Sequence, residues 1–196
     1  MRTFIAIELP KEVKDVLREL QDQLQSSQAD VKWVAAENIH LTLKFLGERD
    51  EKKVEEISQI LDEVAKENQP YEINLISLGT FPDTDHPRVV WAGIDQGDAQ
   101  TRKIAQALEE KIAKVEIPKE DREFSSHITI GRVKSNINRE KLIQGLDNSK
   151  GYLAGKNLLF LATQLLLFKS TLTSKGPVYE ILKTANLTKS CKVKLA

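Results

Sequence analysis

Two short stretches of the sequence, Asn38-Ile39-His40-Leu41-Thr42-Leu43 and Ser125-Ser126-His127-Ile128-Thr129-Ile130, follow one pattern. Each runs histidine, apolar residue, threonine, apolar residue. The chain has only 3 histidines among 196 residues, so two copies of this pattern are not expected by chance. The repeated pattern predicts a chain built from two similar halves.

The spacing between the histidine and the threonine is that of a β-strand. Successive side chains of a strand point to opposite faces, so His40 and Thr42 share one face while their apolar neighbours point into a core. His127 and Thr129 repeat this arrangement. If the halves pack around a pseudo-two-fold axis, both pairs converge on one cleft.

Those side chains suit chemistry at a phosphodiester. Histidine is the side chain whose ordinary pKa lets a neutral base and a protonated acid coexist near pH 7. Threonine hydroxyls can donate hydrogen bonds to phosphate oxygens as charge develops there. A lone histidine of this kind is more often a partly buried strand residue, but the matched pair favours a catalytic site.

The remaining periodicity predicts an α+β fold with two similar halves. We expect strands over 3–9, 31–34, 39–46, 71–78, 89–94 and 127–133, and helices over 10–27, 51–67 and 139–146. A further helix is defined by Ile104, Leu108, Ile112 and Val115. The last third is expected to be strand-rich, over 158–167 and 177–182.

The composition excludes several classes of protein. The 29 basic and 29 acidic residues cancel, which rules out a uniformly basic nucleic-acid coat. No stretch approaches the roughly 20 apolar residues of a membrane-spanning helix, and the amino terminus reads as a strand instead of a signal peptide. We therefore expect a cytoplasmic protein with no membrane partner. The single cysteine, Cys191, leaves no disulfide and no thiolate metal site.

The sequence resembles the two-histidine (2H) phosphoesterase superfamily, and within it the RNA 2′,3′-cyclic phosphodiesterases, also called 2′-5′ RNA ligases. The resemblance covers nearly the whole chain. Besides the two histidine motifs it rests on Arg2-Thr3-Phe4-Ile5-Ala6-Ile7, Lys44-Phe45-Leu46-Gly47, Pro87-Arg88-Val89-Val90-Trp91-Ala92-Gly93 and Gly176-Pro177-Val178-Tyr179-Glu180. The family often has proline before the second histidine, where this chain has Ser126.

The resemblance implies a single domain over 1–196, with two lobes of mainly antiparallel sheets, flanked by helices, around a central cleft. It implies hydrolysis of the terminal 2′,3′-cyclic phosphate of RNA to a 2′-phosphate, and the related 2′-5′ ligation, with no metal and no cofactor. His40 would donate a proton to the departing 3′ oxygen and His127 would accept one from water, while Thr42 and Thr129 hold the phosphate. The protein is expected to act as a monomer on RNA 3′ ends or short oligonucleotides.

Two other functions stay open at this stage. The same chemistry could act on small cyclic nucleotides, or the cleft could bind nucleotides without turnover. Both histidines and both threonines are present, which favours an enzyme, because binding alone does not need two groups that transfer protons.

Two cations near the motifs are candidate phosphate ligands. Lys44 continues the alternation of His40 and Thr42 and should face the cleft, although a surface lysine at a strand end is an equal alternative. Arg132 matches the arginine that commonly follows the second motif and could bind phosphate through two hydrogen bonds. Strict alternation, however, puts Arg132 on the opposite face, so only a bulge or a strand end brings it to the substrate.

Other candidates are weaker. A zinc site would need His86 beside His40 and His127, and His86 is more simply a loop residue. Phe81, Phe124 and Tyr179 either stack on bases at the cleft rim or belong to the core.

Charge is divided along the chain. Residues 1–131 carry 17 basic and 26 acidic side chains, whereas residues 132–196 carry 12 and 3. One explanation is that the first part of the chain has more acid-rich helices with solvated faces. The other is that the excess of basic residues in 132–196 forms an electropositive region with a function. In the second interpretation, Arg132, Lys134, Arg139 and Lys141 form a short basic track for an RNA end.

Overall fold

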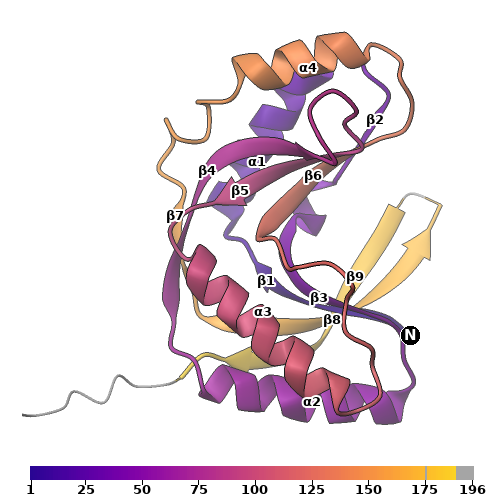
Figure 1. The fold of residues 1–196 in the computed structure, drawn as a ribbon, viewed down its shortest axis with the longest axis vertical. Coiled ribbons are helices and arrows are strands. Elements are labelled where there is room, and N and C mark those ends of the chain that lie inside the picture. Colours follow the sequence, from indigo (N-terminus) through magenta and orange to yellow (C-terminus); the bar gives the residue numbers. More distant parts are fainter. Residues whose placement is uncertain (175, 189–196) are drawn as a thin grey trace, which may run out of the picture.

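Two antiparallel β-sheets form the centre of the molecule (Figure 1). The computed structural model describes residues 1–174 and 176–188. The first sheet has the strand order β3-β1-β8-β9, with β1 Arg2–Glu8, β3 His40–Glu48, β8 Gln164–Thr173 and β9 Gly176–Asn186. The second has the order β2-β6-β5-β4-β7, with β2 Val31–Trp33, β4 Tyr71–Phe81, β5 Val89–Ile94, β6 His127–Val133 and β7 Leu159–Ala162.

Four α-helices cover these sheets in the described part of the chain: α1 Lys11–Gln25, α2 Glu51–Lys66, α3 Asp98–Ala113 and α4 Arg139–Asn148. Two of them cross between the halves. Helix α1 follows β1 of the first sheet but contacts β6 of the second, and α3 follows β5 of the second sheet but contacts β3 of the first. Within the described residues, no helix has the length and apolar composition needed to cross a membrane.

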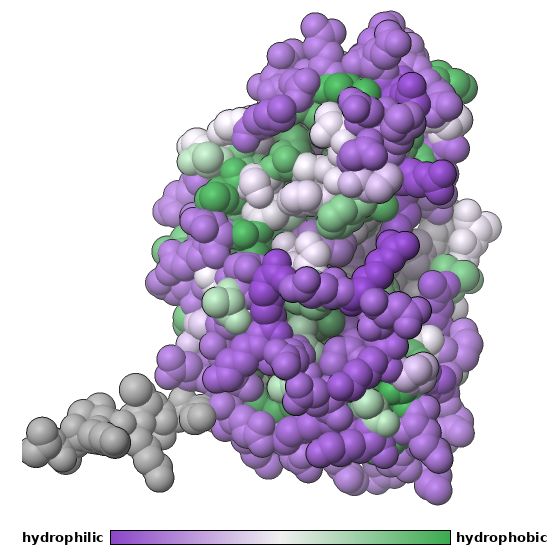
Figure 2. Space-filling model, in the orientation of Figure 1, coloured by the Kyte–Doolittle hydropathy of each residue, from purple (hydrophilic) through white to green (hydrophobic). Residues whose placement is uncertain are grey.

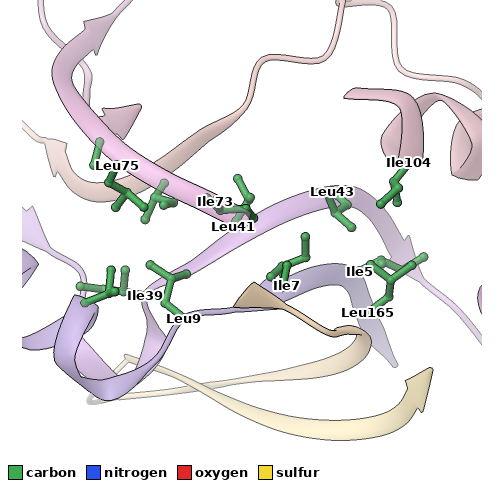
Figure 3. Close-up of a cluster of buried hydrophobic side chains, with 14 of the residues drawn as sticks. Ile5, Ile7, Leu9, Ile39, Leu41, Leu43, Ile73, Leu75, Ile104 and Leu165 are labelled. Atoms are coloured by element: carbon green, nitrogen blue, oxygen red, sulfur yellow. The ribbon is translucent and has the colours of Figure 1, made fainter. Parts of the chain in front are cut away.

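One buried hydrophobic cluster joins both sheets (Figure 3). Ile5, Leu41 and Leu165 from the first sheet lie in the same cluster as Leu75 from the second and Ile104 from α3. Each such side chain stabilises the fold by about 1.5–3 kcal/mol when it is removed from water. Most of the face shown in Figure 2 is hydrophilic, with hydrophobic side chains in small separate patches.

The predicted α+β class with antiparallel sheets is confirmed, and three segments differ most from their predicted ranges. One of them is β9, which continues to Asn186, beyond the predicted end at 182, because it pairs with β8 along this length. The apolar run 158–167 divides at Thr163 into β7 and β8, which belong to different sheets. An apolar run contains no signal for a change of sheet, because both of its parts are equally suited to burial. Strand β4 continues to Phe81, beyond the predicted end at 78, because β5 pairs with it along this length. Cys191 lies outside the described residues.

Candidate active site

The two motif histidines are held by the same backbone contact. His40 starts β3 and its Nδ1 lies 2.7 Å from the carbonyl oxygen of Asn38. His127 starts β6 and its Nδ1 lies 2.7 Å from the carbonyl oxygen of Ser125. A carbonyl oxygen can only accept a hydrogen bond, so Nδ1 carries a hydrogen in both rings. Nε2 is thereby left as the atom that accepts or donates a proton.

Both histidines favour the neutral form in the free protein. Burial lowers the pKa of His40 to about 4, and the positive charges of Lys14 and Arg132 act in the same direction, against the hydrogen bond to Asn38. Burial also lowers the pKa of His127, again with Arg132 acting in the same direction. Because Arg132 influences both rings, it lies within electrostatic reach of each of them.

Aromatic rings fix the orientation of His40. Its ring stacks on Phe4 of β1, with ring centroids 4.8 Å apart, and meets the edge of Tyr179 of β9 at 5.4 Å. From the sequence, Tyr179 could either stack on a base or belong to the core. In the structure, the Tyr179 ring contacts the His40 ring directly. Phe4 was missed as a site residue, although its alternation with Ala6 in β1 places it on the same face.

The second histidine has a corresponding aromatic support. Phe81 of β4 meets the His127 ring edge-on, with centroids 4.9 Å apart, and contacts Trp91 of β5 at 5.2 Å. The Trp91 indole lies over a glycine of the adjacent strand β4 and a glycine of its own strand β5: a Cβ atom at Gly79 would come within 2.3 Å of the indole, and one at Gly93 within 2.8 Å. These two glycines therefore leave room for the ring that supports Phe81. Phe124, by contrast, packs against the main hydrophobic cluster.

The motif threonines share the face of their histidines, as the spacing predicted. Thr42 lies opposite Ala6 of β1, and Thr129 lies opposite Trp91 of β5. Both are half-buried, and no described residue forms a hydrogen bond with either hydroxyl. The two hydroxyls are thus free to donate to a ligand. Strands β3 and β6 lie next to each other where the two sheets meet.

Lys44 does not lie where alternation placed it. The pairing of β1 with β3 skips Leu43, so that Ile5 faces Lys44 while Ala6 faces Thr42. This β-bulge turns Lys44 into the interior, where it is 1% exposed and its Nζ donates to Glu109 Oε1 of α3 at 2.7 Å. The expectation that Lys44 faces the substrate is therefore wrong, because one extra residue reverses the alternation that follows it.

A matching bulge brings Arg132 to the histidine face. The pairing of β5 with β6 skips Ile130, so Trp91 lies opposite Thr129 and Val89 lies opposite Arg132. Trp91 and Val89 point to the same face of β5, and Arg132 therefore shares the face of Thr129. Its side chain is exposed there. The sequence named this bulge as the condition for Arg132 to reach the substrate, and the structure contains it.

Gln21 supports the second bulge from inside the protein. This side chain of α1 is 3% exposed, and its Nε2 donates to the carbonyl oxygens of Ile130 at 2.7 Å and Val34 at 2.8 Å. Ile130 is the bulged residue itself. The sequence reasoning missed Gln21, although a glutamine within the apolar stripe of an amphipathic helix is a detectable signal.

The histidines do not assemble as metal ligands. His86 is 71% exposed in its loop and its Nδ1 lies 3.6 Å from Asp83 Oδ1. Among the residues that the structure describes, no group of three or more His, Cys, Asp or Glu side chains is placed to hold a metal ion.

The sequence of this chain matches the model of a known protein family. The family model described as LigT like Phosphoesterase matches residues 7–91 and 94–179, one stretch around each histidine motif. The chain belongs to the LigT-like phosphoesterase family, within the 2H superfamily. The two matches also agree with the repeat that the motifs predicted.

Several members of the LigT-like family are similar over almost their full length. An RNA 2′,3′-cyclic phosphodiesterase of Methanocaldococcus jannaschii is 38% identical over 93% of this chain and 99% of its own. The protein of that name from Thermotoga maritima is 35% identical over 93% of each chain. The crystal structure of TT0787 from Thermus thermophilus superposes with a TM-score of 0.80 at 28% identity, covering 97% of this chain and 100% of that one. LigT of E. coli complexed with 3′-AMP gives a TM-score of 0.74 at 26% identity, covering 96% and 98%.

Proposed function

We propose that this protein hydrolyses the terminal 2′,3′-cyclic phosphate of RNA to a 2′-phosphate through its two histidines. The observation that carries the proposal is the pair of Nε2 atoms, each left free by the same Nδ1 contact to a backbone carbonyl. The names of the similar family members supply the substrate class.

The reaction divides between the two motifs. Nε2 of His127 takes a proton from water as the water oxygen bonds to phosphorus. The bond from phosphorus to the 3′ oxygen breaks, and protonated His40 donates its Nε2 proton to that oxygen. The products are a 2′-phosphate and a 3′-hydroxyl, and the two histidines regain their starting states by exchanging protons with water. A 5′-hydroxyl of a second RNA in place of water would give 2′-5′ ligation.

The phosphate is held between the two lobes. Thr42 and Thr129 present hydroxyls that have no hydrogen-bond partner among the described residues, one on each histidine face, and Arg132 adds a positive charge. The bound phosphate also supplies a negative charge beside His40. That charge opposes the effect of burial on the His40 pKa and favours the protonated form that donates. Because both proton transfers are assigned to side chains, the proposed step involves no bound metal.

The decisive experiment uses an RNA oligonucleotide that ends in a 2′,3′-cyclic phosphate, incubated with the protein in EDTA. We expect a 2′-phosphate product, identified by its co-elution with a synthetic 2′-phosphate standard and its separation from the 3′-phosphate isomer, which has the same mass. A 3′-phosphate product would reverse the assignment of the leaving group. Activity that is lost in EDTA and restored by a divalent metal would overturn the metal-free mechanism.

A further inference from the structure

A cavity of about 320 Å³ opens beside His40, at the edge of the first sheet. It lies between the short 3₁₀ helix Ala36–Asn38, the end of β1, the start of α1 and strand β9. His127 and Arg132 are not among its lining residues. Its volume falls at the lower end of the roughly 300–1,000 Å³ of small-molecule sites. The cavity is therefore a separate compartment next to one of the two proposed catalytic groups.

The two walls of this cavity differ in chemistry. Phe168, Tyr179 and Ile181 form an aromatic and apolar wall on β8 and β9. Glu8, Lys14 and the backbone around Glu37 form a polar wall opposite. A flat ring whose faces are apolar and whose edge carries donors and acceptors matches such a pair of walls.

The charges of the cavity disfavour an anion. Lys14 Nζ is already engaged by Glu8 Oε1 and by the Glu37 carbonyl oxygen, both at 3.3 Å. Glu8 and Glu37 together outweigh this one positive charge, so a phosphate would meet a net negative lining. The phosphate is better placed beside Arg132, outside the cavity.

We propose that this cavity binds the nucleobase of the nucleoside that carries the cyclic phosphate. The inference rests on the proposed function, in which His40 donates to the departing 3′ oxygen. That oxygen belongs to the ribose of the terminal nucleoside, so its base must lie on the His40 side of the phosphate. The attacking water lies on the opposite side, next to His127.

The test compares two substrates that share the reacting group. Adenosine 2′,3′-cyclic phosphate carries a base, and a methyl riboside 2′,3′-cyclic phosphate does not. A base stacked in the cavity should raise kcat/KM of the wild type about 10- to 100-fold over the abasic substrate. Ile181→Trp, at a lining residue that is 49% exposed, fills the cavity and should abolish this preference while the abasic substrate reacts as before.

Leu161→Trp is the matched control, because Leu161 is 56% exposed on β7, in the other sheet, and should retain the preference. The inference fails if Ile181→Trp keeps the wild-type preference, or if the wild type has none. Absence of turnover with both substrates and with the cyclic-phosphate RNA would instead reject the proposed function, and calorimetric titration with adenosine 2′-phosphate then tests the cavity alone. Binding to the wild type and to Leu161→Trp but not to Ile181→Trp supports the site; equal binding to all three contradicts it.

Discussion

Each proposed catalytic histidine can be tested by its removal. Nε2 of His40 and of His127 would each transfer a proton in the rate-limiting step, and such a transfer typically contributes about 10²- to 10⁴-fold. We expect His40→Ala and His127→Ala to lower kcat by at least about 100-fold on a cyclic-phosphate RNA, with near-native circular dichroism. A variant that keeps near-wild-type turnover would remove that histidine from the mechanism.

The pH dependence of the free enzyme follows from the direction of the two pKa shifts. The active pair holds one proton, so activity requires a pH between the two macroscopic pKa values of the pair. Burial lowers the pKa of His40 to about 4 and also lowers the pKa of His127 from its ordinary value of 6.5. As pH rises, the pair loses its last proton below pH 6.5. As pH falls, it gains the second near pH 4.

We therefore expect a bell-shaped profile of kcat/KM with its optimum on the acid side of pH 6.5. The profile of kcat should lie at higher pH, because the bound phosphate raises both pKa values. Steady-state rates over pH 3.5–9 in constant ionic strength measure both. If kcat/KM instead began to fall only above pH 6.5, the pKa values of the two histidines would not be lowered by burial as expected.

At the scale of secondary-structure elements, the two bulges decide which cation meets the substrate. Both motif strands show the same burial order, in which two buried residues follow the threonine and an exposed residue comes next. In β3 the second buried residue after the threonine is Lys44, and the exposed residue that follows is Phe45. In β6 the second buried residue is Gly131, and the exposed residue is Arg132. The two motif strands are thus similar in backbone, but β3 has the apolar Phe45 at the place where β6 has the cation Arg132.

The bulge in β6 should depend on Gln21. Gln21→Met keeps the shape of the side chain but removes both of its donors, which leaves buried carbonyl oxygens with fewer partners. We expect a loss of about 1–3 kcal/mol in the free energy of unfolding and a raised KM for cyclic-phosphate RNA, because Arg132 loses its fixed position. Gln23→Met, at an exposed position of the same helix, is the control and should change neither quantity. An unchanged KM for Gln21→Met would leave Gln21 with a purely structural role.

The bulge in β3 makes Lys44 a structural residue, and its substitution should show this. Lys44→Met leaves the carboxylate of Glu109, whose side chain is 21% exposed, without its partner. Because water still reaches Glu109, the cost should be smaller than the roughly 3–5 kcal/mol of breaking a fully buried ion pair, and denaturant unfolding would measure it. Lys44→Met together with Glu109→Leu should recover part of that loss. KM should stay near the wild-type value in the folded variant, whereas a large rise in KM would return Lys44 to the substrate.

At the scale of the whole molecule, the position of the basic residues sets the response to salt. Arg132 lies on the histidine face and Lys134 follows it, both exposed, whereas Arg139 and Lys141 belong to α4, which packs against α1. We expect 1/KM to fall more steeply with salt for a long RNA than for a dinucleotide, because each phosphate neutralised by a cation releases counterions. Equal slopes of log KM against log salt for the two substrates would contradict a basic track.

Much of this organisation could be predicted from the sequence, because it depends on local periodicity. Alternation in a strand placed His40, Thr42, His127 and Thr129 on matched faces, and helical periodicity located the helices to within a few residues. These patterns reflect which side chains are buried away from water. The preference of a side chain for burial depends on its own chemistry, so it can be predicted from the local sequence.

The sequence by itself determined the two motifs, their strands and the apolar faces, whereas only the tertiary structure decided what surrounds the histidines. The Leu43 and Ile130 bulges exist in the register between paired strands, and they sent Lys44 inward and Arg132 outward. Gln21 reaches the second bulge from a helix far away in the sequence. The lowered pKa of His40 likewise arises from burial among strands that meet only after folding. Register and burial depend on contacts between distant segments, which a period of two or of 3.6 residues does not encode.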